Sequence, residues 1–527
     1  SLRAAFDYSW ELLPEPEQAM LAWLSVFRGG FDGEAALTIT GKKERNRRER
    51  GERGVLLANS ALSAPPQLNS PQSGLRQLSA LVDKSLVQRQ ANGRYQLHEA
   101  IRLFAQEQIS PADWAQVRTA HAGYYADFMA DRGSKSTGEE AEAAFRLMAL
   151  ELENGRFAWQ WALTDWSATE PLLSQMLPHL SLFYLRRGRS LEALDWLAEA
   201  LQTIAADHPL TARLHHQFAK HEEAVGRFAE AQVRLLVCLP GLEAPDLVPY
   251  AADAWEMLGR AQRHLGDLTD AEASFQRSLT LHRLSGQTSN VAGVLNSLGV
   301  LTKNNGRYSE AIAYYMESLS IFRRQVDRSG IAVCLINLGN IANVQGDYEW
   351  ARACYQESYE LAAAAENRGQ MAINLLNLGS VARATGEAIT AEQQYQASLA
   401  LGREIGNGLI AAAALDGLGQ TRLMLGDLPG ARLVLREGLE TAVALKSSSM
   451  ILTLLASVGR ALAGQPLGAA LLFLALSHEN TPHHVREEVL AFAAAEQMTL
   501  PDLGQPGLDL EEGVRLSLTE LSAEPAI

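Results

Sequence analysis

The sequence has few cysteines and no long apolar run. Three cysteines, Cys238, Cys334 and Cys354, occur among its 527 residues, and an odd, widely spaced set argues against a disulfide framework. We therefore expect free thiols in a reducing, cytoplasmic compartment. The longest apolar candidate, residues 469–476, is far shorter than the roughly 18 residues that span a bilayer, so no membrane segment is predicted.

Basic residues are outnumbered by acidic ones. Lys and Arg total 46 against 61 Asp and Glu, which gives a formal net charge of -15. Such a chain repels polyanions unless its bases gather on one surface, so nucleic acid is not the expected partner. The densest basic stretch, residues 42–53, is predicted to belong to a flexible insertion at about 40–74. Contact with nucleic acid or an acidic partner is the alternative for this stretch.

Motifs of catalysis are also missing from the sequence. It contains no G-x-x-x-x-G-K-[ST] phosphate loop and no G-x-S-x-G nucleophile motif. Its histidine pairs, at 215–216 and 483–484, are adjacent in sequence and would diverge around a helix instead of sharing a metal. We predict no enzyme activity, no catalytic residue and no metal ligand in this chain. The start at Ser1, without Met or a leader, suggests a fragment of a longer protein.

What the sequence does contain is a repeat with a period of 40 residues. Leu-Gly pairs recur at Gly259, Gly299, Gly339, Gly379 and Gly419. A second glycine column follows at Gly226, Gly266, Gly306, Gly346, Gly386 and Gly426, and an aromatic column at Phe275, Tyr315, Tyr355 and Tyr395. We read each copy as two antiparallel helices. The first glycine allows the helices to approach, the second allows the turn, and the aromatic ring is expected to pack into the neighbouring hairpin.

These columns resemble the tetratricopeptide repeat, in a longer 40-residue form. The resemblance implies an all-α fold in which hairpins stack into a right-handed α-solenoid over residues 171–480, with a C-terminal cap and a frayed tail at 481–527.

Such a solenoid is expected to present a groove lined by the first helix of each hairpin. Polar and basic residues recur there, and asparagine amides can pair with the backbone of an extended peptide. The alternative is that the asparagines bridge adjacent hairpins. The predicted groove residues are Arg260, Arg263, Asn296, Lys303, Asn337, Asn340, Asn343, Asn377, Arg383 and Gln420.

Residues 1–109 lack the repeat. Their pattern predicts two helices within 1–28, a helix at 75–82, a β-hairpin at 85–98 around Asn92-Gly93, and a helix at 99–109. This is the order of a winged helix with a small β-hairpin wing, and a helical linker at 110–170 would join it to the repeats.

The phrases SLRAAFDYSWELLPEPEQ, LAWLSVFRGGFDGEAA, LVDKSLV and YQLHEAIRLFAQEQ, followed by ELEN at 151–154 with Trp159 and Trp161, carry a further resemblance. The module is similar to the winged-helix domain of STAND (signal-transduction) NTPases, which include plant disease-resistance (NLR-like) proteins and bacterial regulators. The resemblance implies that His98 senses the β-phosphate of ADP, since it stands where the family's Met-His-Asp triplet has its histidine; Glu99 replaces the Asp. The alternative for His98 is a packed histidine at the end of the hairpin, hydrogen-bonded locally. The chain itself would need no cofactor, while ADP or ATP would bind an NTPase domain upstream in the full-length parent.

We therefore expect the sensing and autoinhibitory arm of a STAND NTPase, in which the groove binds a protein or peptide signal. Two alternatives remain open at this stage. One is a DNA-binding transcriptional regulator whose repeats sense an effector, and the other is a constitutive protein scaffold.

Overall fold

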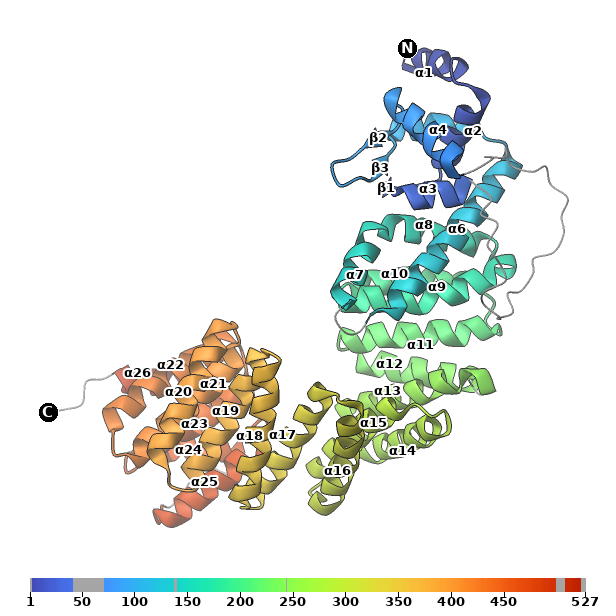
Figure 1. Ribbon diagram of the computed structural model, residues 1–527. Helices are drawn as coiled ribbons and strands as arrows, with labels where there is room; N and C mark the ends of the chain where they lie inside the picture. The colour runs from blue at the N-terminus through green and yellow to red at the C-terminus, as the bar shows by residue number, and fades with distance from the viewer. Residues whose placement is uncertain (1, 41–70, 137–139, 243, 499–507, 523–527) are drawn as a thin grey trace. The chain divides into compact units, whose positions relative to one another are not determined.

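The computed structural model describes residues 2–40, 71–136, 140–242, 244–498 and 508–522. They belong to two compact units, Ser1–Ser278 and Leu279–Ile527, and both are built almost entirely of helices (Figure 1). One small three-stranded sheet completes the described part of the chain, in agreement with the predicted all-α class. The basic stretch at residues 42–53 lies outside the described residues.

The N-terminal module follows the predicted order of elements, with three differences. One is helix α3, which was not predicted. The hairpin strands pair antiparallel, and Gly93 takes a positive φ of 81° at the turn between them. A third strand, β1, pairs with β3; at two residues it is too short for an alternating pattern to reveal it. Helix α4 begins at Pro71, earlier than predicted. The elements are α1 (Leu2–Glu11), α2 (Glu15–Leu24), β1 (Gly30–Phe31), α3 (Gly33–Thr40), α4 (Pro71–Asp83), β2 (Gln88–Arg89), β3 (Tyr95–Gln96) and α5 (Glu99–Glu107).

Four helices follow where the sequence suggested a helical linker: α6 (Pro111–Ser134), α7 (Ala141–Leu150), α8 (Leu152–Thr164) and α9 (Trp166–Arg186). They do not form a solvated connection. One hydrophobic cluster runs from Leu13 through Tyr125 and Trp159 to Leu214. The N-terminal module, these helices and the first repeats therefore share one core.

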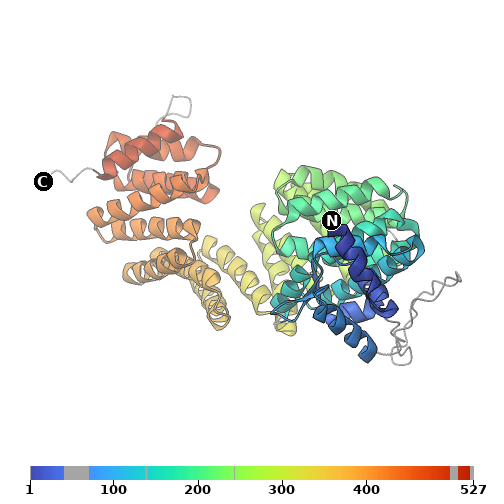
Figure 2. The same cartoon turned by 90° about the horizontal axis from the view of Figure 1, so that it is seen from above.

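Within each unit taken by itself, the helices that follow form hairpins that lie side by side in succession (Figures 1 and 2). Those of the first unit comprise α10 (Ser190–Thr203), α11 (Pro209–Ala224), α12 (Phe228–Cys238) and α13 (Val248–Leu265), and the boundary between the units falls within α14 (Leu268–Leu284). The second unit continues with α15 (Thr288–Asn304), α16 (Tyr308–Gln325), α17 (Arg328–Val344), α18 (Tyr348–Ala364), α19 (Arg368–Ala384), α20 (Ala388–Glu404), α21 (Gly408–Met424), α22 (Leu428–Ala444), α23 (Ser448–Ala461) and α24 (Pro466–Ser477).

The two glycine columns have the different roles that their positions predict. Gly306 and Gly346 adopt positive φ angles of 73° and 79° at the turns. Gly299 and Gly339 lie instead against rings, because a Cβ atom there would come within 2.5 Å of Tyr315 and 2.6 Å of Tyr355, respectively. Close helix packing thus depends on this glycine column.

The expected place of the aromatic ring needs a correction. Tyr315 and Tyr355 lie against the glycine of their own hairpin's first helix, whereas the sequence suggested the neighbouring hairpin. Tyr395 contacts both, since a Cβ atom on Gly379 of its own hairpin or on Gly417 of the next would meet its ring. The Tyr395 side chain is long enough to fill the space beside Gly379 and still reach Gly417 on the first helix of the next hairpin.

The described C-terminal residues form a packed cap that includes one helix more than the short helical cap expected before a frayed tail. Helix α25 (His483–Ala495) is followed by α26 (Leu510–Ser522), which packs against α22, α23 and α24. Leu510, Val514 and Leu518 recur at four-residue spacing and, with buried Leu521, join the terminal core cluster. This stripe covers apolar surface that the last hairpins would otherwise expose.

The three cysteines are buried free thiols. Burial raises the pKa of Cys238 to about 12 and that of Cys354 to about 11, so neither thiol ionises readily. None of the helices in the described part of the chain combines the length and apolar character needed to cross a bilayer.

Candidate functional site

Equivalent positions on the first helices of successive hairpins carry most of the predicted binding residues. We call this surface the first-helix face and describe it separately for each unit. In the second unit it comprises half-buried polar residues of α15, α17, α19 and α21: Asn296, Lys303, Asn337, Asn340, Asn343, Asn377, Arg383 and Gln420.

Two of the asparagines bind each other. The amide nitrogen of Asn337 on α17 donates to Oδ1 of Asn296 on α15 at 3.1 Å, which links adjacent hairpins as the alternative reading of these residues proposed. The pair leaves the Asn296 nitrogen and the Asn337 oxygen without a partner among the residues described. One donor and one acceptor, the two groups that an extended peptide backbone requires, therefore remain available.

Lys303, near the end of α15, has a more unusual environment. It is half-buried, and burial lowers the pKa of its ammonium group. No carboxylate within the described ranges forms an ion pair with it. A desolvated cation without a counter-charge is destabilising unless something supplies that charge. Among the predicted binding residues on this face, Lys303 is therefore the one whose charge the described chain leaves uncompensated.

The other asparagines differ in how many of their hydrogen-bonding groups remain unpaired in the described structure. The hydroxyl of Tyr355 donates to Oδ1 of Asn340 at 2.8 Å, so the amide nitrogen of Asn340 remains available. Asn343 and Asn377 are half-buried and have no hydrogen-bond partner in the described part of the chain. Asn343 occupies the repeat position of Lys303 one hairpin further along, so both side chains belong to one column.

Arg383 and Gln420 belong to a polar network at the C-terminal end. Gln420 donates to Asp416 at 2.8 Å and to Ser457 at 3.1 Å. Arg460 donates to Glu488 of α25 at 2.9 Å, and Arg383 lies 3.9 Å from the same carboxylate. The chain's own cap thus engages Arg383 through Glu488, and side chains of α21 and α23 occupy Gln420.

Asp416 is the least expected member of this network. Its side chain is buried, with 7% of the residue exposed, and burial raises its pKa to about 6. One of its oxygens, Oδ1, has no partner among the residues the structure covers. Neither Asp416 nor Glu488 was predicted as functional, because Glu488 lies outside the periodic columns and Asp416 occupies a column that is mostly uncharged.

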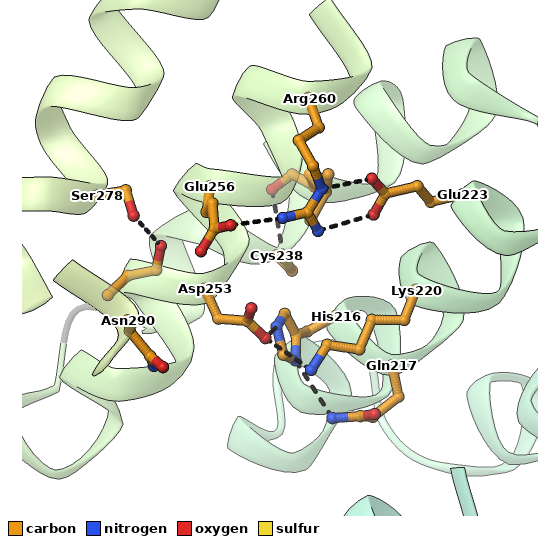
Figure 3. Close-up of polar contacts among 12 residues, drawn as sticks. His216, Gln217, Lys220, Glu223, Cys238, Asp253, Glu256, Arg260, Ser278 and Asn290 are labelled. Carbon is orange, nitrogen blue, oxygen red and sulfur yellow. Dashed lines mark hydrogen bonds and ion pairs between the residues drawn. The ribbon is translucent and has the colours of Figure 1, made fainter. Parts of the chain in front are cut away.

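The first unit has its own charged cluster on α11 and α13 (Figure 3). Arg260 donates from Nε and Nη2 to Glu223 at 2.6 and 3.0 Å, and from Nη1 to Glu256 at 2.7 Å. Two carboxylates therefore neutralise Arg260. Arg263 is half-buried, and its guanidinium lies 3.3 Å from the ring nitrogen Nε2 of His264. Of the two predicted arginines in the first unit, Arg263 is the one not held by a carboxylate in the described structure.

Asp253 stands at the centre of the same cluster and was not predicted. Nε2 of His216 lies 2.9 Å from it and Nζ of Lys220 lies 2.6 Å from it. Burial alone would raise the pKa of Asp253, but Lys220 and His216 outweigh burial and hold that pKa well below its usual range. The arrangement links α11 to α13 by balanced charges, which suits a structural role.

His98 lies at a cavity of about 310 Å³ in the N-terminal module. It is the N-cap of α5, and its Nδ1 accepts a hydrogen bond from the Ala100 amide at 3.2 Å. This contact leaves Nε2 as the ring's donor. Glu99 and Arg102 also line the cavity, and Arg102 pairs with Glu99 through two hydrogen bonds of 2.8 and 2.5 Å.

A buried network attaches the hairpin to α8. Arg94 donates to Glu151 at 2.5 Å and to the Gly30 carbonyl at 2.7 Å. Asn154 donates to Glu151 at 2.9 Å and to the Gly30 carbonyl at 3.0 Å. Tyr125 adds a hydroxyl donor to Glu151 at 2.8 Å. The ELEN segment at 151–154, which the sequence analysis used only as part of a family resemblance, therefore joins the N-terminal module to the helices that follow.

Comparison with known families identifies the repeats. Residues 290–364 and 370–442 match a tetratricopeptide repeat model, and residues 252–282 match a second one. These parts of the chain are tetratricopeptide repeats, as predicted.

The chain also matches curated proteins named as HTH-type transcriptional regulators. They come from Mycobacterium bovis and Mycobacterium tuberculosis, and each is 31% identical over 205 residues. The matched stretch covers 38% of this chain and 20% of the relative. The chain therefore spans about one-fifth of the length of these relatives.

Solved structures with a similar arrangement of helices include a STAND signal-transduction ATPase with a tetratricopeptide repeat sensor from Pyrococcus horikoshii. Its TM-score is 0.48 at 16% identity, over 84% of this chain and 66% of that chain. The apo form of the quorum sensor NprR from B. thuringiensis also has a TM-score of 0.48 at 16% identity, over 69% of this chain and 97% of that chain.

Proposed function

We propose that the first-helix face of the second unit binds a protein or peptide signal, and that the N-terminal module relays this event to a nucleotide-binding domain of the STAND type. The observation that carries the binding half is Lys303, a half-buried cation without a counter-ion among the residues described. The free amide groups of Asn343 and Asn377 support it, since they suit the backbone of an extended chain.

Hydrogen exchange tests where the ligand binds. A peptide selected on the immobilised chain from a random displayed library should slow amide exchange in α15, α17 and α19. Protection confined to other helices would place the ligand elsewhere and contradict the proposal.

The second half of the proposal assigns nucleotide sensing to His98. Its Nε2 is a donor at the start of α5 and at the edge of a cavity, a suitable place for one phosphate oxygen. Arg102 is neutralised by Glu99, so the cavity offers one phosphate contact and would rely on a separate domain to hold ADP. His98→Ala in the full-length protein should speed ADP release, whereas unchanged release would exclude this role.

The relay would run through the network of Arg94, Glu151 and Asn154, which fixes the hairpin and β1 to α8. A ligand shifts such an element only if it binds two conformations with different affinity. Peptide binding should therefore change the rate of ADP release in the full-length protein. If peptide binds and nucleotide release does not change, the chain acts as a scaffold instead.

A second candidate function is transcriptional regulation, favoured by the name of the mycobacterial relatives. In this case the N-terminal module and residues 42–53 would bind DNA. Gel shifts over a salt series test it, because affinity from phosphate contacts falls steeply with salt. Binding that survives deletion of residues 42–53 would exclude this stretch from the contact.

A further inference from the structure

A second cavity, of about 200 Å³, lies between α8, α9 and α10 within the first unit. It is remote in sequence from the repeats matched as tetratricopeptide repeats and is independent of the function proposed above. Its lining combines aromatic rings from all three helices with a set of acidic side chains from one of them.

The floor of this cavity is aromatic. Trp159 and Tyr184 are buried, with 2% and 1% of each residue exposed, and half-buried Trp196 joins them. The Trp159 and Trp196 rings meet edge to face with centroids 5.0 Å apart, and those of Tyr184 and Trp196 lie 6.1 Å apart. Electron-rich ring faces attract cations, most strongly where water is excluded.

The rim is acidic. Glu192, Asp195 and Glu199 line the cavity, and their spacing along α10 places them on one face of that helix. Arg189 already pairs with Glu192 through two hydrogen bonds of 2.6 Å. Asp195 and Glu199 form no side-chain hydrogen bond or ion pair with any residue that the structure describes, so their charge remains available.

The basic side chains Arg189 and Arg156 near the cavity are already engaged within the chain. Arg189 lies over the Tyr184 ring at 5.4 Å from its centroid, so this aromatic group already interacts with one cation of the chain. Arg156, the basic lining residue, lies 3.7 Å from Glu153, which offsets its charge. The cavity therefore combines an aromatic floor with uncompensated negative charge.

Three polar atoms of the floor also lack partners. The indole nitrogens of Trp159 and Trp196 and the hydroxyl of Tyr184 are buried without a hydrogen bond to any described residue. Buried polar atoms are normally paired. Because indole N–H groups only donate, these nitrogens would pair with an oxygen of the occupant and not with its ammonium group.

We propose that this cavity binds an alkylated ammonium ion. Trp159, Tyr184 and Trp196 contact the alkyl groups around the nitrogen, and Asp195 and Glu199 balance its charge. The cation belongs either to a free small molecule such as choline or to a methylated lysine side chain of a peptide.

Titration of the chain with choline, followed by tryptophan fluorescence and calorimetry, tests the proposal. We expect saturable binding that weakens as salt rises. The neutral isostere 3,3-dimethylbutanol should bind about 10-fold more weakly or not at all, since it lacks the charge that cation–π attraction requires. Equal binding of the isostere, or no saturable binding of choline and of a trimethyllysine peptide, would overturn the proposal.

Two variants and a control locate the site. The exposed pair Asp195→Asn with Glu199→Gln should weaken choline binding about 10-fold and leave the fold intact, and Trp196→Leu should weaken it at least as much. The control, Asp207→Asn with Glu230→Gln, removes the same charge from exposed residues that do not line the cavity. Equal weakening in the Asp195/Glu199 double variant and in its control would show long-range attraction only and would overturn the site.

The source of the cation is decided by comparing two ligands. Tighter binding of a trimethyllysine peptide than of choline would assign the cation to a protein; equal or weaker binding would assign it to a small molecule.

Discussion

Nη1 of Arg94 lies 2.5 Å from Oε1 of Glu151, and this contact joins the β-hairpin of the N-terminal module to helix α8. Both side chains are largely buried, with 14% and 5% exposed. Glu151 also accepts from Tyr125 and Asn154. The pair is therefore a buried ion pair with its other hydrogen bonds satisfied, the arrangement in which loss of one partner is most damaging.

Replacing Glu151 should loosen the N-terminal module. We expect Glu151→Gln to lower the free energy of unfolding by roughly 3 kcal/mol, because Arg94 would remain buried without its counter-charge. Denaturant unfolding measures this loss, and amide exchange in the hairpin should rise with it. The control is Glu107→Gln, which breaks the exposed ion pair with Arg3, where side-chain exposures are 55% and 69%; it should cost at most about 1 kcal/mol. Similar losses in both variants would contradict the role of the buried pair.

The glycine column makes a second prediction. Gly339→Ala should destabilise the second unit by about 1–3 kcal/mol, since the new methyl group would meet the Tyr355 ring. Gly293→Ala is the matched control: it lies inside α15 with nothing within 4 Å of its added Cβ. This control should gain about 0.5–1 kcal/mol from helix propensity. Thermal unfolding of both variants checks the difference in sign, and two changes of the same sign would refute it.

Asp416 makes stability depend on pH. Its folded-state pKa of about 6 lies above the value of about 4 for an unfolded aspartate. Burial therefore adds almost no penalty below about pH 4, where the group is mainly neutral in both states. Stability should fall as pH rises from about 4 to about 6, and then stay lower.

Asp416→Asn isolates this effect from the other carboxylates. The variant should match the parent near pH 4 and be more stable by on the order of 2–3 kcal/mol near pH 7.5, because it carries no charge to desolvate. Urea unfolding of both proteins across this range measures the difference. A stability difference that does not change with pH would show that Asp416 is not held protonated by burial.

Periodic features of the fold could be predicted from sequence because each depends on a local requirement that recurs. Gly306 must take a positive φ, and Gly339 must leave room for a ring; both demands repeat every 40 residues. The two-residue strand β1 and the terminal helix α26 were not predicted. Each is positioned by one contact that does not recur along the chain: β1 pairs with β3, and α26 packs against α22, α23 and α24.

For the candidate site, too, the sequence predicted the repeated positions but not the partners of the residues at those positions. The sequence placed Lys303 and Asn343 in one repeat column, yet it could not show which polar residues the chain satisfies itself. Arg260 binds Glu223 and Glu256, while Gln420 binds Asp416. Glu223 lies on another helix, whereas Glu256 and Asp416 lie one turn away on the same helix, in a repeat column whose other members are uncharged. Only the packed structure therefore separates occupied groups from available ones.

Lys303 provides the most direct test of the account, which holds that the first-helix face of the second unit binds a peptide. The measurement is the Kd of the library-selected peptide, by fluorescence anisotropy, for the parent chain and for a double variant that combines Lys303→Ala with Asn343→Ala. We predict Kd to rise about 10-fold or more, as expected for loss of a charge-assisted hydrogen bond. Arg324→Ala, which removes an exposed cation of α16, should leave Kd unchanged. Equal Kd values for the parent, the double variant and the Arg324→Ala control would contradict peptide binding at this face.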